Sequence, residues 1–308
     1  MESVGRRKPQ SQQARCVAWP QRCRNCISCI SNDRPELLGA HMALSPMTTK
    51  RPDKLLVSNE EWQAWGQLDP LYAVATIREH AKGGGNAWTD ENFYEIGAVD
   101  WNLFQPSWDQ YGLNYGTCVE IGCGAGRLTG QLARYFQTVQ ALDVSANMIE
   151  YARAHVPSNV SFHVTGGLNI PLPDNSADAI FSAHVLQHLS GTAAVEAYMR
   201  EMHRVLKPEG TVMLHVPLIV WPWGSLEGIH KLVHRLKASL DRCRTQLARY
   251  AFRLALRKTP PMHVIWCEMS WLYSTLQQLG FEDIEIRVLL GGSKMAVQHP
   301  FVFARKKG

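Results

Sequence analysis

A glycine-rich loop between a predicted strand and a predicted helix constrains this chain more than any other feature. Residues 117–126 read Thr-Cys-Val-Glu-Ile-Gly-Cys-Gly-Ala-Gly, and Leu128, Leu132 and Phe136 follow at helical spacing. The β-favouring run before the glycines predicts a buried strand. A glycine loop placed between a strand and a helix lets a ligand approach bare backbone amides at the helix N-terminus. The loop therefore predicts a ligand site in an α/β protein.

The spacing of the glycines separates the classes of ligand. A dinucleotide-binding loop, Gly-x-Gly-x-x-Gly, would place its third glycine at position 127, where this chain has Arg127. The phosphate-binding pattern Gly-x-x-x-x-Gly-Lys-Ser/Thr is absent as well. The chain instead reads Glu-x-Gly-x-Gly-x-Gly from Glu120. These differences disfavour a nicotinamide-dependent oxidoreductase.

Strands and helices alternate after the glycine loop. The pattern predicts strands over 139–144, 160–164, 178–184 and 211–216, with helices near 145–153 and over 196–206. A further helix over 268–279 and two strands, 281–290 and 296–304, complete the predicted elements. Such an alternation is typical of a parallel, doubly wound sheet.

Polar side chains stand where the predicted strands end. Asp143 ends the second strand, a placement that suits hydrogen bonding to both hydroxyls of a ribose. His184 and His188 follow the fourth strand, and a helix starting at Val185 would place both on one face. Both histidines are candidates for substrate contact or proton transfer, with His188 a candidate general base, and a purely structural role is the alternative.

These motifs together resemble the class I S-adenosylmethionine-dependent methyltransferases, of the small-molecule, UbiE-like type. Residues 117–126 resemble motif I, and Ala-Leu-Asp-Val-Ser-Ala-Asn-Met-Ile-Glu-Tyr-Ala-Arg at 141–153 resembles the second motif. Arg-Val-Leu-Lys-Pro-Glu-Gly at 204–210 and Gly-Phe-Glu-Asp-Ile at 280–284 are also similar to family segments. The resemblance implies a Rossmann-like, doubly wound α/β sheet of seven strands, in the order 3-2-1-4-5-7-6 with strand 7 antiparallel.

The resemblance implies S-adenosylmethionine as the cofactor. The glycine loop would hold its methionyl part, Glu120 would orient that loop or bind the ammonium group, and Asp143 would hold the ribose. Residues 166–170 would meet the adenine; Gly166 replaces the family's aspartate there, so backbone groups of Gly167 and Leu168, or Asn169, would take over its contact. The expected cofactor-binding residues are Glu120, Gly122, Cys123, Gly124, Gly126, Asp143, Val144, Met148, Gly167, Leu168, Ala183 and His184.

The implied activity is methyl transfer by in-line displacement to a small molecule or to a lipid or glycan precursor. Because the sulfonium is an excellent leaving group, orientation and exclusion of water can supply most of the acceleration. The alternative is a methyltransferase-like protein that binds the cofactor without turnover and docks a partner through basic helices. Nucleic-acid methylation is disfavoured, because Ser-Ala-His-Val at 182–185 stands where base methylases carry Asn/Asp-Pro-Pro-Tyr/Phe.

The N-terminal regions lie outside the resemblance. Residues 1–54 hold ten Lys or Arg against four Asp or Glu and lack periodicity, which predicts a disordered basic extension. Its cysteines, Cys16, Cys23, Cys26 and Cys29, have no second paired knuckle, so no metal site is predicted. The extension is interpreted as non-functional sequence ahead of Met42 or Met47, with a targeting peptide as the alternative. Residues 55–110 predict a helical cap in which Tyr94 and Trp108 are candidate substrate contacts.

An insertion over about 217–261 interrupts the predicted methyltransferase domain, 111–308. Trp221 and Trp223 in it are candidate substrate contacts. Residues 226–258 hold nine Lys or Arg against two acidic residues, with apolar residues at helical spacing. This pattern predicts one or two helices that form a lid. A solvated basic face over an apolar contact is the preferred interpretation, and contact with anionic lipid, an acidic substrate or nucleic acid is the alternative.

The remaining composition bounds the class of protein. No apolar run approaches the ~18 residues of a membrane-spanning helix, and the N-terminus lacks the apolar core of a secretory signal. Eight unevenly spaced cysteines do not form the pattern of a disulfide framework. These features predict a cytoplasmic protein and leave the oligomeric state open. The resemblance implies an acceptor that is a small or lipid-like molecule.

Overall fold

The computed structural model describes residues 57–77, 80–81, 86–166, 168–219, 227–255, 259–292 and 298–308. The described residues belong to one compact unit, and residues 1–48 lie outside the described ranges. The four N-terminal cysteines, Gly167, Trp221 and Trp223 are likewise outside the described residues.

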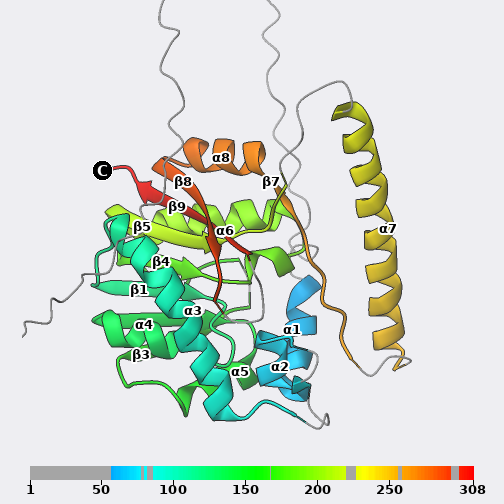
Figure 1. Ribbon diagram of the computed structural model, residues 1–308, viewed down its shortest axis with the longest axis horizontal. Helices are drawn as coiled ribbons and strands as arrows, with labels where there is room; N and C mark the ends of the chain where they lie inside the picture. The colour runs from blue at the N-terminus through cyan, green and yellow to red at the C-terminus, as the bar shows by residue number, and fades with distance from the viewer. Residues whose placement is uncertain are drawn as a thin grey trace, which may run out of the picture. The chain divides into compact units, whose positions relative to one another are not determined.

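A seven-stranded sheet forms the centre of the molecule (Figure 1). Its spatial order is β3-β2-β1-β4-β5-β9-β8, and β9 runs antiparallel to both of its neighbours. In sequence numbering of the seven strands this is 3-2-1-4-5-7-6, which confirms the predicted fold class. The strands are β1 Thr117–Ile121, β2 Thr138–Asp143, β3 Val160–Val164, β4 Ala177–Ser182, β5 Leu206–His215, β8 Phe281–Leu290 and β9 Gln298–Lys306.

Helices pack on both faces of this sheet, as its buried side chains require. One face packs against α3 (Asp90–Gln110) and α4 (Thr129–Tyr135), through fully buried rings such as Trp101, Phe104 and Phe181. The other face packs against α6 (Thr192–Val205) and α8 (Met269–Gln278), with Met199, Val212 and Leu272 completely buried. The central strands are apolar on both sides, as expected for parallel strands covered on both faces.

Two short helices precede the sheet and lie beside its carboxyl edge. They are α1 (Val57–Leu68) and α2 (Pro70–Val74), and both contact α5 (Ala146–Arg153). Gly66 permits the close approach of α1, because a Cβ at this position would lie 2.1 Å from Ser145 Oγ. Gly97 plays the same part in α3, where a Cβ would lie 2.3 Å from the carbonyl oxygen of Arg127.

The segment after β4 differs from its prediction. His184 has a positive φ of 61°, and only a single 3-10 turn, η3 (Leu186–His188), precedes α6. The predicted helix from Val185 is therefore wrong, and His184 and His188 do not share a helical face. A small two-stranded sheet, β6 (Leu218–Ile219) with β7 (Cys267–Glu268), links the chain before the insertion to the chain after it.

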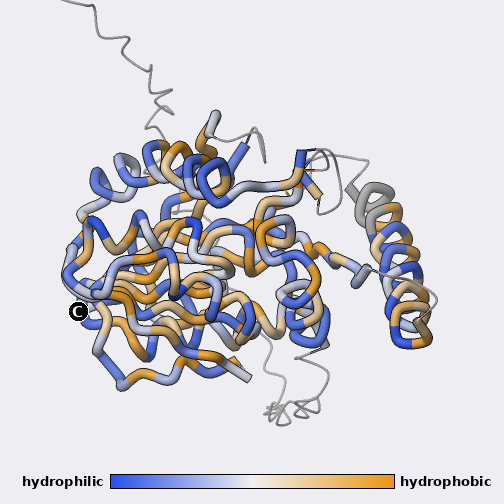
Figure 2. The backbone as a smooth tube through the Cα atoms, turned by 90° about the horizontal axis from the view of Figure 1, so that it is seen from below, coloured by the Kyte–Doolittle hydropathy of each residue, from blue (hydrophilic) through white to orange (hydrophobic). Residues whose placement is uncertain are grey.

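The predicted insertion contains one long helix, α7 (Glu227–Arg253). It lies beside α1 rather than against the sheet (Figure 1), and ion pairs of Arg249 with Glu61 and of Arg253 with Glu60 join the two helices. Polar and apolar residues alternate along its turns (Figure 2). Among the described helices, none is both long and apolar enough to cross a membrane.

Candidate functional site

A cavity of about 630 Å³ opens at the carboxyl ends of the central strands. The rule for open α/β sheets places ligands at this edge, where the strand order reverses between β1 and β4. The cavity begins at the glycine loop and continues past the ends of β4 and β5 to the segment before α8. One continuous space therefore adjoins both the predicted cofactor residues and the chain after the insertion.

The glycine loop is hydrogen-bonded to the end of β2. The amides of Gly122 and Cys123 donate to the carbonyl oxygen of Leu142 at 2.7 and 2.9 Å, and the amide of Gly124 donates to Asp143 Oδ2 at 2.8 Å. These three amides are thus already paired, in contrast to the bare amides that the sequence predicts. The glycines leave space for a ligand because they have no side chains. None of these three amides is free to donate a hydrogen bond to it.

Two valines limit the space above the loop. Gly122 and Gly124 have φ values of 75° and 52°, which favour glycine. A Cβ at Gly122 would lie 2.2 Å from Val185, and one at Gly124 would lie 2.5 Å from Val74 of α2. Both valines line the cavity. The loop, η3 and α2 therefore shape this end of the cavity together.

Asp143 organises the polar end of the cavity. Its Oδ1 accepts from the amide of Ser145 at 2.9 Å while its Oδ2 accepts from Gly124, so the carboxylate joins the glycine loop to the start of α5. Burial raises its pKa, and the backbone donors oppose that rise. The remaining lone pairs of the Asp143 carboxylate can accept hydrogen bonds from the hydroxyls of a ribose.

Glu120 is a buried carboxylate without a full set of partners. It is 3% exposed, and its Oε2 accepts no hydrogen bond from the described residues. Burial, opposed in part by Thr129 and Arg127, raises its pKa to about 7. A cationic ligand group in the cavity would satisfy this oxygen and favour the charged form.

The charge of Arg127 is balanced by the carboxylate of Asp100. It forms a buried ion pair with Asp100 of α3 and also lines the cavity. The residue that disfavoured a dinucleotide loop in the sequence thus joins the glycine loop to α3.

The two histidines differ in how their ring nitrogens are engaged. His188 donates from Nδ1 to the carbonyl oxygen of His263 at 2.7 Å and accepts at Nε2 from the Gln187 amide at 3.0 Å. Burial lowers its pKa to about 4. His184 keeps its Nε2 buried and unpartnered, and burial lowers its pKa well below the ordinary value. Both rings are therefore neutral at pH 7.

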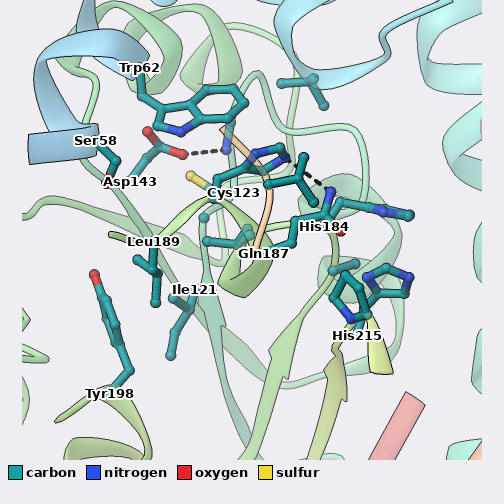
Figure 3. Close-up of a pocket in the computed structure, with 18 of the residues that line it drawn as sticks. Ser58, Trp62, Ile121, Cys123, Asp143, His184, Gln187, Leu189, Tyr198 and His215 are labelled. Carbon is teal, nitrogen blue, oxygen red and sulfur yellow. Dashed lines mark hydrogen bonds between the residues drawn. The ribbon is translucent and has the colours of Figure 1, made fainter. Parts of the chain in front are cut away.

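Most predicted cofactor residues meet in this cavity. Figure 3 shows Trp62, Ser58 and Asp143 on one side of it and His184 and His215 on the other. The predicted residues that line it are Glu120, Gly122, Cys123, Gly124, Asp143, Val144, Met148, Leu168, Ala183, His184 and His188.

Three other predicted residues lie elsewhere. Gly126 faces α5, where a Cβ would lie 2.9 Å from the Ala152 Cβ. Tyr94 donates its hydroxyl to the carbonyl oxygen of Ala125 at 2.8 Å, behind the loop. Trp108 is fully buried against the sheet and donates from Nε1 to Thr211 Oγ1 at 3.1 Å.

The sequence did not single out several residues that line the cavity. Ser58, Asn59 and Trp62 come from α1, and Trp62 packs edge-on against His188 with ring centroids 4.9 Å apart. His215 ends β5, so the rule that pointed to His184 at the end of β4 also applies to it. The far end of the cavity is mostly apolar, formed by Pro217, Leu218, Val264, Trp266, Met269, Ile286, Val288 and Pro300. None of the described residues of 86–110 lines the cavity.

Comparisons with known proteins agree with this geometry. Residues 119–214 match a family described as a methyltransferase domain. The chain is 35% identical over 102 residues to methyltransferase GfsG of Streptomyces halstedii, covering 31% of this chain and 36% of that protein. It is 31% identical over 98 residues to demethylmenaquinone methyltransferase of Tropheryma whipplei, covering 31% of this chain and 39% of that protein. In both cases the match spans less than two thirds of the relative's own length.

A solved structure shares the fold. The [4+2]-cyclase SpnF superposes with a TM-score of 0.51 and 16% identity, over 81% of this chain and 96% of that chain. Identity at this level establishes the architecture alone, since one fold can host different chemistry.

Proposed function

Because the chain contains a methyltransferase domain of the class I S-adenosylmethionine-dependent family, we propose that it transfers a methyl group to a small acceptor with an apolar body. S-adenosylmethionine is the cofactor of this domain. The observation that carries the proposal is the single cavity that runs from the cofactor loop to an apolar end.

The described residues fit the cofactor. The unpartnered Glu120 oxygen suits the methionyl ammonium group, Asp143 suits the ribose, and Leu168 with Met148 offers an apolar wall to the adenine. The cofactor supplies a methyl group on a sulfonium, which an acceptor nucleophile displaces in line. The chain contributes orientation of the two reactants and exclusion of water.

The acceptor end favours an apolar molecule. Trp266, Val264 and Val288 line the cavity, yet they remain 56%, 43% and 54% exposed, so apolar side chains also surround its opening. Neighbouring apolar side chains at the rim of a cavity suit an acceptor with an aliphatic or aromatic body. A lipid-like acceptor fits this surface better than a glycan precursor does.

A direct assay tests the proposed activity. The full chain is incubated with S-adenosylmethionine carrying an isotopically labelled methyl group and with an apolar extract fractionated by polarity. We expect S-adenosylhomocysteine to form together with a labelled product in the apolar fractions. Label only in polar fractions would contradict the apolar acceptor while leaving methyl transfer in place.

Helix α7 supports contact with an anionic membrane surface. At 100° per residue its exposed apolar side chains gather on one face, and they are Leu232, Val233, Leu236, Leu240, Leu247 and Tyr250. The exposed Arg235, Lys237, Arg242 and Arg244 flank that face. An apolar stripe bordered by cations is the pattern of a helix that lies in a lipid interface.

The position of α7 connects this surface to the cavity. Thr245 of α7 contacts His263 across 3.5 Å between Oγ1 and Nδ1, and the carbonyl oxygen of His263 accepts from His188, which lines the cavity. Thr245 lies on the side of α7 opposite the apolar stripe, so a membrane bound by that stripe would lie one helix diameter, roughly 10–12 Å, from this contact.

Vesicle flotation tests this surface. Vesicles of phosphatidylcholine with phosphatidylserine should carry the full chain to the top of a gradient, and phosphatidylcholine alone should do so weakly. The double change Arg242→Glu with Arg244→Glu should abolish flotation, whereas Arg200→Glu on the exposed side of α6 should leave it unchanged. Equal flotation of all three proteins would contradict the assignment to α7.

The exposed stripe of α7 also favours the second candidate, a cofactor-binding protein that docks a partner without turnover. The shared fold with a cyclase shows that this architecture is not confined to methyl transfer. Cofactor binding without S-adenosylhomocysteine formation across the whole extract would favour this candidate.

A further inference from the structure

Three histidines from three adjacent strands meet at the carboxyl edge of the sheet. His184 follows β4, His215 ends β5, and His299 is the second residue of β9. One ring nitrogen of each lies within 4.8 Å of the others. The rings of His184 and His215 have centroids 4.1 Å apart, and that of His299 lies 5.6 and 6.0 Å from them.

Each of these rings holds a buried nitrogen without a partner. His184 Nε2, His215 Nδ1 and His299 Nδ1 are all inaccessible to solvent and accept or donate no hydrogen bond among the described residues. His215 is 4% exposed and His299 is fully buried. An unsatisfied buried polar atom costs about 1–3 kcal/mol, so three in one cluster call for a physical explanation.

The hydrogen bond at Nε2 selects the tautomer of a neutral His299 ring. Its Nε2 lies 3.1 Å from the carbonyl oxygen of Gly291, which can only accept, so in the neutral ring the proton is on Nε2. In that tautomer Nδ1 of His299 carries a lone pair. A backbone carbonyl that holds the far nitrogen of a metal-binding imidazole is a recurrent arrangement around metal ions.

Aromatic packing accounts for only part of the cluster. His215 packs against Phe301 with centroids 5.5 Å apart, and His299 packs against Phe104 at 5.3 Å. Phenylalanine or leucine would fill these positions without leaving polar atoms unsatisfied.

We propose that His184, His215 and His299 bind a divalent transition-metal ion, Zn²⁺ being the best match, with an open coordination position that faces the cavity and takes an oxygen or nitrogen atom of the methyl acceptor. Imidazole nitrogen is a preferred ligand of Zn²⁺, and three protein ligands with one open position characterise catalytic sites. His184 and His215 both line the cavity, which gives the open position its direction. A tetrahedral site needs nitrogens roughly 3.4 Å apart, and these lie within 4.8 Å of one another, so the rings must close by up to about 1.4 Å.

The site deepens the proposed function and rests on it for its role in the reaction. At neutral pH the low pKa of His188 makes it a weak base, so a hydroxyl acceptor needs another source of activation. A divalent ion lowers the pKa of a bound oxygen. With the ion bound, the acceptor O–H bond would release its proton to bulk solvent before the cofactor closes the site, the O–C bond to the methyl group would form, and the C–S bond would break with its electrons left on sulfur.

Metal binding is tested apart from activity. Full-length, untagged protein with Cys16, Cys23, Cys26 and Cys29 replaced by Ser is stripped with a chelator and titrated with Co²⁺ and then Zn²⁺. We expect one ion per chain, visible Co²⁺ absorption of a nitrogen-liganded tetrahedral site, and loss of that absorption as Zn²⁺ displaces Co²⁺. The variants in the same background are His215→Phe, His299→Phe and His184→Asn, the last chosen because asparagine tolerates the positive φ of His184.

Each ligand variant should weaken Zn²⁺ binding by more than about 100-fold, beyond the usual effect of a residue outside the ligand set. The control His163→Gln, on β3 at the edge of the sheet, should bind as the parent does. Thermal melting and far-ultraviolet circular dichroism report whether each variant is folded. Absence of a stoichiometric ion, or affinity unchanged in the folded His184→Asn protein, would overturn the proposal. Failure of the parent to bind S-adenosylmethionine would instead count against the proposed function.

Discussion

At the scale of single residues, Glu120 and Asp143 set the properties of the cofactor end. Both carboxylates lie beside the glycine loop, Glu120 buried and Asp143 half-buried, yet Asp143 accepts two backbone hydrogen bonds while Glu120 has an unpartnered oxygen. Asp143 therefore organises the site before any ligand arrives. Burial disfavours the charged form of Glu120, and a cationic ligand beside it would favour that form.

The buried position of Glu120 predicts a pH dependence of stability. Its pKa rises from 4.5 to about 7 on folding, so the folded protein keeps a proton that the unfolded chain releases in this window. The contribution to stability is complete below pH 4.5 and is lost as the pH rises through 7. The Glu120→Gln variant has no titratable group at this position, so its stability lacks this pH-dependent loss. In melts without cofactor, the variant should therefore gain stability relative to the parent from pH 5 to pH 8, and a constant difference would contradict the assignment.

Gly97 allows α3 to lie against the glycine loop. A Cβ there would come within 2.3 Å of the Arg127 carbonyl oxygen, so Gly97→Ala should lower the stability by about 1–3 kcal/mol. Gly130 in α4 is the matched control, since its Cβ would meet only Val156 at 3.8 Å. Gly130→Ala should be neutral or stabilise by up to about 1 kcal/mol. Similar denaturant midpoints for both variants would show that α3 does not depend on this contact.

At the scale of elements, the ion pairs between α1 and α7 hold the long helix. The Arg249–Glu61 pair is buried, with side chains 12% and 8% exposed, whereas the Arg253–Glu60 pair is 63% and 70% exposed. Removing one partner of a buried pair leaves an uncompensated charge, and an exposed pair contributes little. The two neighbouring glutamates thus offer a matched comparison.

Glu61→Gln should loosen α7, while Glu60→Gln should not. Hydrogen exchange over residues 245–253 should quicken in Glu61→Gln by at least about tenfold, the equivalent of roughly 1.4 kcal/mol, because breaking a buried pair costs more than that. Glu60→Gln should exchange as the parent does. Equal protection in both variants would mean that other contacts hold the helix.

Elements also show where the sequence was informative. The strands around the glycine loop and Asp143 follow from local patterns, and β3 and β8 have the predicted bounds. The helix predicted after His184 fails because the pattern Val-Leu-Gln-His-Leu suits a helix locally, whereas the positive φ at His184 and at Gly191 limits it to one 3-10 turn. Local periodicity does not report such breaks.

At the scale of the whole molecule, the site depends on contacts between distant segments. Trp62 contacts His188 because Gly66 allows α1 to lie close to α5. In the sequence, the only sign of this close helix packing was a glycine inside a predicted helix. The three-histidine cluster needs the order of β4, β5 and β9 to be known first. The strand order itself came from resemblance to a family, since spacing alone does not select it. The predicted acceptor contacts Trp221 and Trp223 lie outside the described residues.

The most direct test of the central claim is calorimetric titration of the full chain with S-adenosylmethionine. Saturable binding of one molecule per chain is expected. Asp143→Ala should weaken it at least about tenfold, since it removes a charged acceptor from the ribose and from the loop amides. Asp174→Ala, at an exposed ion pair with Arg204, should bind as the parent does. Absence of binding by the folded parent, or equal affinity of the parent and Asp143→Ala, would contradict the account.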